Sequence, residues 1–235
     1  MPSLPWSYLG RMDYARALAL QYAHAARVSA GAVPRLLLAE HPPTITLGRQ
    51  ADRRHLRLTE EEYRRRGIGL VRVLRGGDVT YHGPGQLVGY PIVSLDALHL
   101  SVPAWVERVA QSLVDYLACR GLGARWSDLH PGVWVGGEKI AALGFHLQRR
   151  VSTHGFALNL EPALEDFGLI VPCGLAHLGV TSLAAQGLQV PPLREAAAEL
   201  AGLLAVRLGL EPGEALPAEA VLAEVADADP AQMQR

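Results

Sequence analysis

Amphipathic helical segments in this sequence are separated by pairs of short apolar runs, and this spacing constrains the fold most strongly. Residues 12–30 and 102–118 carry apolar side chains at helical spacing, and a glycine that favours a helix end follows each segment. Two short apolar runs, at residues 36–39 and 44–47, follow the first of them. The helices therefore lack the strict strand–helix–strand alternation of a doubly wound parallel sheet. We predict an α+β fold, in which helices pack on a mixed sheet.

The same reading places further elements along the chain. Thr59 and Glu62 form a capping box for a short polar helix, and Gly136 and Gly137 supply the backbone of a hairpin turn. Strands are predicted at residues 70–74 and 87–93, on both sides of that turn within 133–147, and at 156–160, with a last helix at 192–208. We expect one domain over residues 1–210, with a possible small lobe from about 185, and a peripheral, partly flexible tail over 211–235.

Composition excludes several classes of protein. Of the 235 residues 49% are hydrophobic, and 22 basic side chains balance 23 acidic ones, so no overall charge favours nucleic acid or an anionic membrane. Two cysteines, Cys119 and Cys173, cannot form a disulfide framework. The chain shows no basic leader before an apolar run, and no uncharged apolar stretch approaches the roughly 18 residues that span a bilayer. We expect a cytoplasmic protein without nucleic-acid or membrane partners.

Lys139 is the only lysine beside 21 arginines. On a strand Lys139 would share one face with Ala141 and Leu143, and small apolar neighbours would lower the pKa of its amine. An amine that can lose its proton suits acid–base chemistry, which arginine cannot perform. The alternative is a single solvated lysine on the surface.

A glycine-rich stretch, residues 75–86, places four glycines and a proline around Arg75, Tyr81 and His82. Glycine lets the backbone approach closely, so this stretch can line a narrow cavity into which Tyr81 and His82 project. It matches neither phosphate-binding glycine pattern, so nucleotide binding gains little support. A cluster of turns without function is the alternative.

Cys173 stands between a proline and a glycine, which favours a turn with an exposed thiol. A nearby cation such as Lys139 would raise its thiolate fraction, although a lone cysteine in a turn is as often structural. Cys119 falls on a predicted helix and reads as a core residue.

His154 reads more readily as a hydrogen-bonded structural residue than as a catalyst. The histidines show no metal-ligand spacing, so we expect no metal.

Four motifs together make the chain resemble the octanoyl-[acyl-carrier-protein]:protein N-octanoyltransferases of lipoate biosynthesis, from about residue 10 to 205. They are Arg-Gly-Gly-x-x-Thr-Tyr-His-Gly-Pro-Gly-Gln, Gly-x-Lys-Ile-Ala-x-Leu-Gly, His-Gly-x-Ala-Leu-Asn and Pro-Cys-Gly. The resemblance implies a fold similar to the catalytic domain of biotin and lipoate ligases. It also implies that Cys173 is the acyl-thioester nucleophile and Lys139 its acid–base partner. The acyl chain would be held by Arg75, Gly76, Gly77, Asp78, Val79, Thr80, Tyr81, His82, Ala142, Leu143, Gly144, His154, Gly155, Phe156 and Ala157. Ala142 stands where many relatives carry serine, so no hydroxyl contact is available there.

The expected reaction moves an octanoyl group from octanoyl-acyl carrier protein to a lysine of a lipoyl domain, without a cofactor. The acceptors implied are the lipoyl domains of 2-oxoacid dehydrogenase complexes and the glycine cleavage H protein. An acidic carrier would dock on basic side chains, for which Arg53, Arg54 and residues 64–66 are candidates. Two alternatives remain: an ATP-dependent lipoate or biotin ligase on the same fold, and a non-catalytic module that binds a carrier protein.

Overall fold

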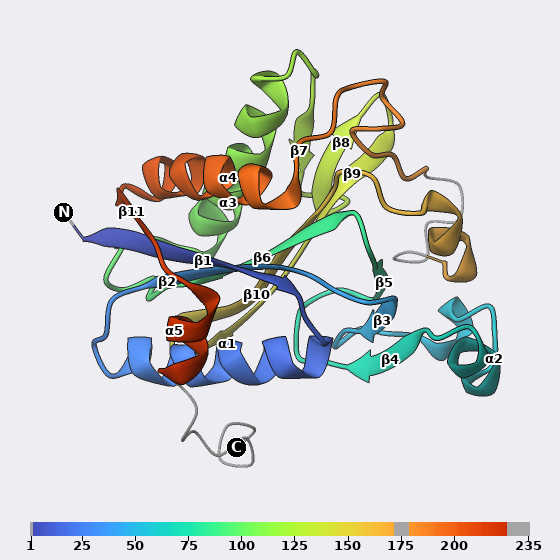
Figure 1. Cartoon of the computed structure of the whole chain (residues 1–235), viewed down its shortest axis with the longest axis horizontal. Coiled ribbons are helices and arrows are strands. Elements are labelled where there is room, and N and C mark those ends of the chain that lie inside the picture. The colour runs from blue at the N-terminus through green and yellow to red at the C-terminus, as the bar shows by residue number, and fades with distance from the viewer. Residues whose placement is uncertain (1, 172–178, 225–235) are drawn as a thin grey trace.

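The computed structural model describes residues 2–171 and 179–224, which form two sheets covered by helices (Figure 1). An eight-stranded sheet has the strand order β11-β1-β2-β6-β10-β9-β8-β7, and a three-stranded sheet has the order β4-β3-β5. The strands are β1 (Ser3–Arg11), β2 (Arg35–Glu40), β3 (Thr44–Leu47), β4 (Gly69–Arg72), β5 (Val79–His82), β6 (Gln86–Ile92), β7 (Arg125–Ser127), β8 (Gly132–Val135), β9 (Glu138–Gln148), β10 (Val151–Asn159) and β11 (Glu211–Ala215). The helices are α1 (Tyr14–Ser29), α2 (Glu60–Arg65), α3 (Val102–Ala118), α4 (Leu193–Leu208) and α5 (Ala218–Ala223), with short 3-10 turns η1 (Arg53–His55) and η2 (Leu164–Leu169).

The large sheet is mixed, as predicted. Strand β1 pairs in parallel with β11 and β2, whereas all pairs from β2 through β6, β10, β9 and β8 to β7 are antiparallel. Helices α3 and α4 cover one face, and α1 and α5 cover the other (Figure 1). Leu36 and Leu38 of β2 join the core on the α3–α4 side, while Leu37 and Ala39 join the core on the α1 side. Because both faces are covered, β2 reads as a continuous apolar run.

Local signals account for the helix boundaries. The Asp13 side chain caps α1, Ser101 caps α3, and the capping box of Thr59 and Glu62 at α2 is present as predicted. Helix α4 ends at Gly209, whose φ of 72° is in the left-handed region that favours glycine. The predicted hairpin also forms, because Gly136 and Gly137 both adopt positive φ between β8 and β9.

The small sheet has a core of its own on the side of α2. Strand β3 pairs in parallel with β4 and antiparallel with β5. Ile45, Tyr63, Tyr81 and Phe167 pack together there, and all are buried. The sheet thus supports η2, which precedes the undescribed residues 172–178.

Several elements escaped the sequence reading. Strands β1, β5, β7 and β11 were not predicted, because they are short or carry polar residues, proline or glycine. The segment 211–224 was read as part of a peripheral tail. In the structure β11 is an exposed edge strand, Val221 of α5 is fully buried, and Glu224 forms an ion pair with the buried Arg35 (3.2 Å). Edge pairing and this ion pair attach the segment to the sheet.

The prediction that Cys119 is a core residue is wrong. Cys119 follows the last residue of α3 and is exposed, as is Ala118, because these two positions face solvent at the helix end, whereas Tyr116 and Leu117 before them are buried in the core. Among the described residues no helix is long and apolar enough to cross a membrane.

Candidate active site

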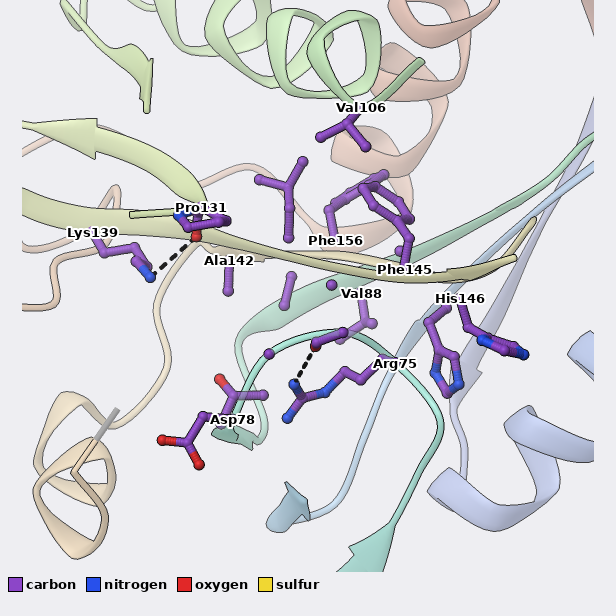
Figure 2. Close-up of a pocket in the computed structure, with 18 of the residues that line it drawn as sticks. Arg75, Asp78, Val88, Val106, Pro131, Lys139, Ala142, Phe145, His146 and Phe156 are labelled. Atoms are coloured by element: carbon purple, nitrogen blue, oxygen red, sulfur yellow. Dashed lines mark hydrogen bonds between the residues drawn. The ribbon is translucent and has the colours of Figure 1, made fainter. Parts of the chain in front are cut away.

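A pocket of about 1100 Å³ opens between the large sheet, the small sheet and the start of α3 (Figure 2). Its apolar wall includes Val88 of β6, Val106 of α3, Phe145 of β9 and Phe156 of β10, and Phe145 packs edge-on against buried Trp105 (4.3 Å between ring centroids). The facing loop between β4 and β5 brings Arg75 and Asp78 to the pocket. The following predicted residues line it: Arg75, Gly76, Gly77, Asp78, Val79, Thr80, His82, Ala142, Leu143, Gly144, His154, Gly155, Phe156 and Ala157.

Two glycines let this loop and the strands approach closely. Gly144 of β9 lies opposite Gly155 of β10, and a Cβ at Gly155 would come within 1.9 Å of the Gly89 carbonyl oxygen. A Cβ at Gly144 would lie 3.2 Å from both Arg75 Cδ and the Gly76 carbonyl oxygen. The Gly76 amide donates to the Phe145 carbonyl (2.8 Å). Close contact between backbone atoms, rather than packing between side chains, therefore joins the 75–78 loop to β9.

The guanidinium of Arg75 is buried within the pocket wall. Its Nη2 donates to the Thr46 carbonyl (2.7 Å) and to Thr46 Oγ1 (2.9 Å), and Nη1 donates to the Gly76 carbonyl (3.0 Å; Figure 2). These bonds compensate part of the cost of burying the charge and orient the side chain along the loop.

His82 and His154 line the pocket as neutral imidazoles. Burial is the main cause that lowers the pKa of each to about 3. His82 Nδ1 lies 2.7 Å from Gln86 Oε1, and Gln86 Nε2 donates to Asn159 Oδ1 (2.9 Å). His154 has a positive φ of 58°, and its backbone amide donates to Gln21 Oε1 (2.8 Å). The His154 ring faces the pocket: its Nδ1 lies 3.4 Å from the Tyr14 hydroxyl, and its Nε2 is buried without a hydrogen-bond partner among the described residues.

Tyr81 corrects one prediction. It was expected to project into the cavity beside His82, but adjacent residues of β5 point to opposite faces. The Tyr81 ring packs edge-on against Phe167 (5.3 Å), and its hydroxyl donates to Asp166 Oδ2 (2.6 Å). Tyr81 therefore anchors η2 to the small sheet and does not line the pocket.

Lys139 lies at one end of the pocket. Its Nζ donates to the Pro131 carbonyl (3.2 Å) and sits 4.9 Å from the centroid of the Trp134 ring. Of the residues predicted to share its face, Leu143 lines the same pocket, whereas Ala141 is fully buried in the core. That the amine has a lowered pKa stays a prediction.

Cys173 lies outside the described residues, but the chain on each side of residues 172–178 is described. On the N-terminal side, the Val171 amide donates to the His55 carbonyl (2.8 Å). On the C-terminal side, the Lys139 amide donates to the Gly179 carbonyl (2.9 Å), and the Thr181 amide donates to the Lys139 carbonyl (3.0 Å). The backbone of Lys139 is thus bonded directly to the segment that follows the Pro-Cys-Gly motif.

Sequence reasoning missed a second group of pocket residues. Tyr14 and Tyr90 contribute from α1 and β6, and Val102 and Val106 contribute from the start of α3. Their apolar or aromatic character was read as ordinary core, and no spacing distinguishes a cavity wall from a core contact. Within the described part of the chain, no group of three or more histidine, cysteine or acidic side chains is placed to hold a metal ion.

Comparisons with known proteins indicate the family of this chain. The family model described as the lipoyl protein ligase A/B catalytic domain matches residues 13–202. The octanoyltransferase of Solibacter usitatus is 49% identical over 182 residues, which cover 77% of this chain and 82% of that protein. The octanoyltransferase of Chloroflexus aggregans is 44% identical over 221 residues, which cover 92% and 100%.

Among solved structures, a bipartite lipoate protein ligase from Thermoplasma acidophilum superposes with a TM-score of 0.75 at 18% identity. The superposition covers 98% of this chain and 94% of that one, so the two share a fold. The predicted similarity to the lipoate ligase catalytic domain is confirmed. The sequence relatives described above are octanoyltransferases, and the family model covers most of the chain. The chain therefore belongs to the lipoyl protein ligase A/B catalytic domain family.

Proposed function

We propose that this protein transfers an octanoyl group from octanoyl-acyl carrier protein to a lysine of a lipoyl domain, through an acyl thioester on Cys173. The observation that carries this proposal is the position of Lys139. Its side chain lines the pocket that carries the apolar wall, and its backbone is bonded to the chain that follows the Pro-Cys-Gly motif. A cysteine held near an amine at the end of an acyl pocket is suited to acyl transfer.

In the first step the Cys173 thiolate attacks the thioester carbonyl of the donor. The carbon–sulfur bond to the carrier breaks, and the released thiolate takes a proton from the Lys139 ammonium. In the second step the acceptor amine attacks the acyl-Cys173 carbonyl and loses a proton to neutral Lys139, while the Cys173 thiolate leaves. Lys139 therefore returns to its starting protonation state after one cycle.

The apolar wall supports the choice of a medium-length acyl chain. Val88, Val106, Phe145 and Phe156 offer hydrocarbon surface, and the neutral forms of His82 and His154 avoid placing two more charges against it. Removal of an eight-carbon chain from water would supply much of the binding free energy, at about 0.8 kcal/mol for each buried methylene.

The proposed partners follow from the family. The donor is octanoyl-acyl carrier protein, and the acceptors are lipoyl domains of 2-oxoacid dehydrogenase complexes and the glycine cleavage H protein, in a cytoplasmic setting. Three of the arginines considered for carrier docking have acidic partners nearby: Arg53 bonds Glu60, Arg54 bonds Asp52, and Arg64 bonds Glu61. These pairs reduce the net positive charge of that surface.

The experiment is intact-mass measurement after the protein is mixed with octanoyl-acyl carrier protein. We expect an octanoyl adduct that Cys173→Ala abolishes and that a lipoyl domain discharges. Cys119→Ala is the matched control, because Cys119 is an exposed thiol on the end of α3 and its removal should leave the adduct intact. An adduct that persists in Cys173→Ala would contradict the assignment.

An ATP-dependent ligase is the alternative, because structural neighbours of this fold include lipoate ligases. The sequence relatives cited above are named octanoyltransferases, which favours octanoyl transfer over ATP-dependent ligation. Release of pyrophosphate from ATP in the presence of octanoate, with no need for a carrier, would support the ligase instead.

A further inference from the structure

Asp78 is a buried carboxylate in the wall of the pocket. The residue is 8% exposed, its Oδ1 accepts the Asp52 amide (3.1 Å), and its Oδ2 is bonded to His55 Nδ1. Within the described residues, Asp78 forms its ion pair with His55 rather than with an arginine. A carboxylate has about four lone-pair positions, so these two bonds leave acceptor capacity on Asp78.

Asp78 is located at the same end of the pocket as Lys139. Figure 2 shows both side chains on the left of the view, Lys139 above Asp78, and His146 on the right. The backbone supports this placement, because His55, the partner of Asp78, accepts the Val171 amide. The Lys139 backbone pairs with Gly179 and Thr181. The two walls of this end are thus bonded to the two chain segments that flank residues 172–178.

The donor's acyl group does not account for a carboxylate here. An octanoyl chain is uncharged, and burial of an anion beside hydrocarbon is unfavourable unless a partner compensates it. Of the groups that react in the proposed transfer, the acceptor lysine is the one that arrives as a cation, because its free pKa is about 10.4.

We propose that Asp78, held in place by His55, forms the subsite for the ammonium group of the acceptor lysine. This inference rests on the proposed function and deepens it. The carboxylate accepts a hydrogen bond from the ammonium and directs its nitrogen toward the acyl carbonyl. The ammonium first releases one proton to solvent, and the neutral nitrogen attacks the acyl carbonyl. Its second proton passes to neutral Lys139 Nζ as the carbon–nitrogen bond forms, the carbon–sulfur bond breaks and Cys173 leaves as a thiolate. Asp78 binds and orients, and it exchanges no proton.

The test compares two nucleophiles on preformed octanoyl-enzyme. A lipoyl domain supplies a charged lysine, and hydroxylamine supplies an amine that is mostly neutral at pH 7. Loss of one charge-assisted hydrogen bond corresponds to roughly a tenfold change. We therefore expect Asp78→Asn to lower the ratio of the lipoyl-domain rate to the hydroxylamine rate about tenfold, mainly through a higher KM for the lipoyl domain. Because misfolding would reduce both rates together, the ratio isolates the subsite.

Two variants serve as controls. Glu61→Gln removes an exposed carboxylate that pairs with Arg64 outside the pocket lining, and should leave the ratio unchanged. Asp128→Asn removes a second, exposed carboxylate of the pocket wall. An unchanged ratio in Asp78→Asn, or a loss found only in Asp128→Asn, would overturn the inference. Absence of any octanoyl adduct in the parent protein would instead overturn the proposed function.

Discussion

Buried neutral histidines should make this protein sensitive to mild acid. His24, His82 and His154 are 2%, 6% and 1% exposed, and burial is the main cause that lowers their pKa values, to about 4, 3 and 3. In the unfolded chain a histidine binds a proton at its ordinary pKa of about 6.5. The folded state therefore holds fewer protons than the unfolded state at pH 5, and stability falls as the pH decreases below about 6.5 toward the folded pKa values.

The magnitude follows from the pKa differences. Between pH 7 and pH 5 each of the three histidines should cost about 2 kcal/mol of unfolding free energy, or about 6 kcal/mol together. Small domains are stable by only about 5–15 kcal/mol, so the loss should be easily measured. Urea unfolding at pH 7, 6 and 5, followed by circular dichroism, gives the free energy at each pH.

One substitution isolates a single histidine. His24 lies outside the pocket, so His24→Leu should remove about 2 kcal/mol from the difference between pH 7 and pH 5, whatever its effect at pH 7. His99→Asn is the control, because His99 is exposed and asparagine tolerates its positive φ of 51°. Equal stability of the parent at pH 7 and pH 5 would refute the reasoning, as would an unchanged difference in His24→Leu.

Three further predictions address the core of the small sheet and the site. Tyr63→Phe removes a buried hydroxyl that donates to the Leu169 carbonyl (2.6 Å) and accepts the Arg57 amide (3.1 Å), so urea unfolding should show a loss of about 1–3 kcal/mol. A loss below 0.5 kcal/mol would show that solvent replaces these bonds. Ala142→Leu should narrow the pocket and slow octanoyl transfer more than butanoyl transfer in matched rate assays, whereas equal losses would indicate general damage. Lys139→Arg keeps a charge but supplies no base, so discharge of the acyl-enzyme should slow about 10²- to 10⁴-fold while some adduct still forms, and a parental discharge rate would show that only charge is needed.

Local patterns in the sequence were sufficient for helices α1 to α4 and most strands of the large sheet, but not for α5. Residues 102–118 were predicted as a helix and form α3, because apolar periodicity and the cap at Ser101 agree. Failures occurred where pairing across the sheet overrides local preference. Strand β11 contains Pro212 and Gly213 and forms only because β1 offers an edge to pair with.

Motif chemistry identified most of the pocket lining but not its geometry. Fourteen of the fifteen residues assigned to the acyl chain line the pocket, and Tyr81 does not. The direction of a side chain on a strand depends on pairing register, which a glycine-rich motif does not reveal. Tyr81 therefore turned out to anchor η2 at Asp166.

The sequence by itself determined the fold class, the family motifs and the residue types available for chemistry, because these depend on local spacing and composition. Only the tertiary structure decided which distant residues meet. In the folded chain the Lys139 backbone is hydrogen-bonded to Gly179 and Thr181, and the His55–Asp78 pair lies beside the backbone of Val171. Such contacts depend on strand order, loop paths and covered faces, which are set by packing of the whole chain rather than by any local pattern.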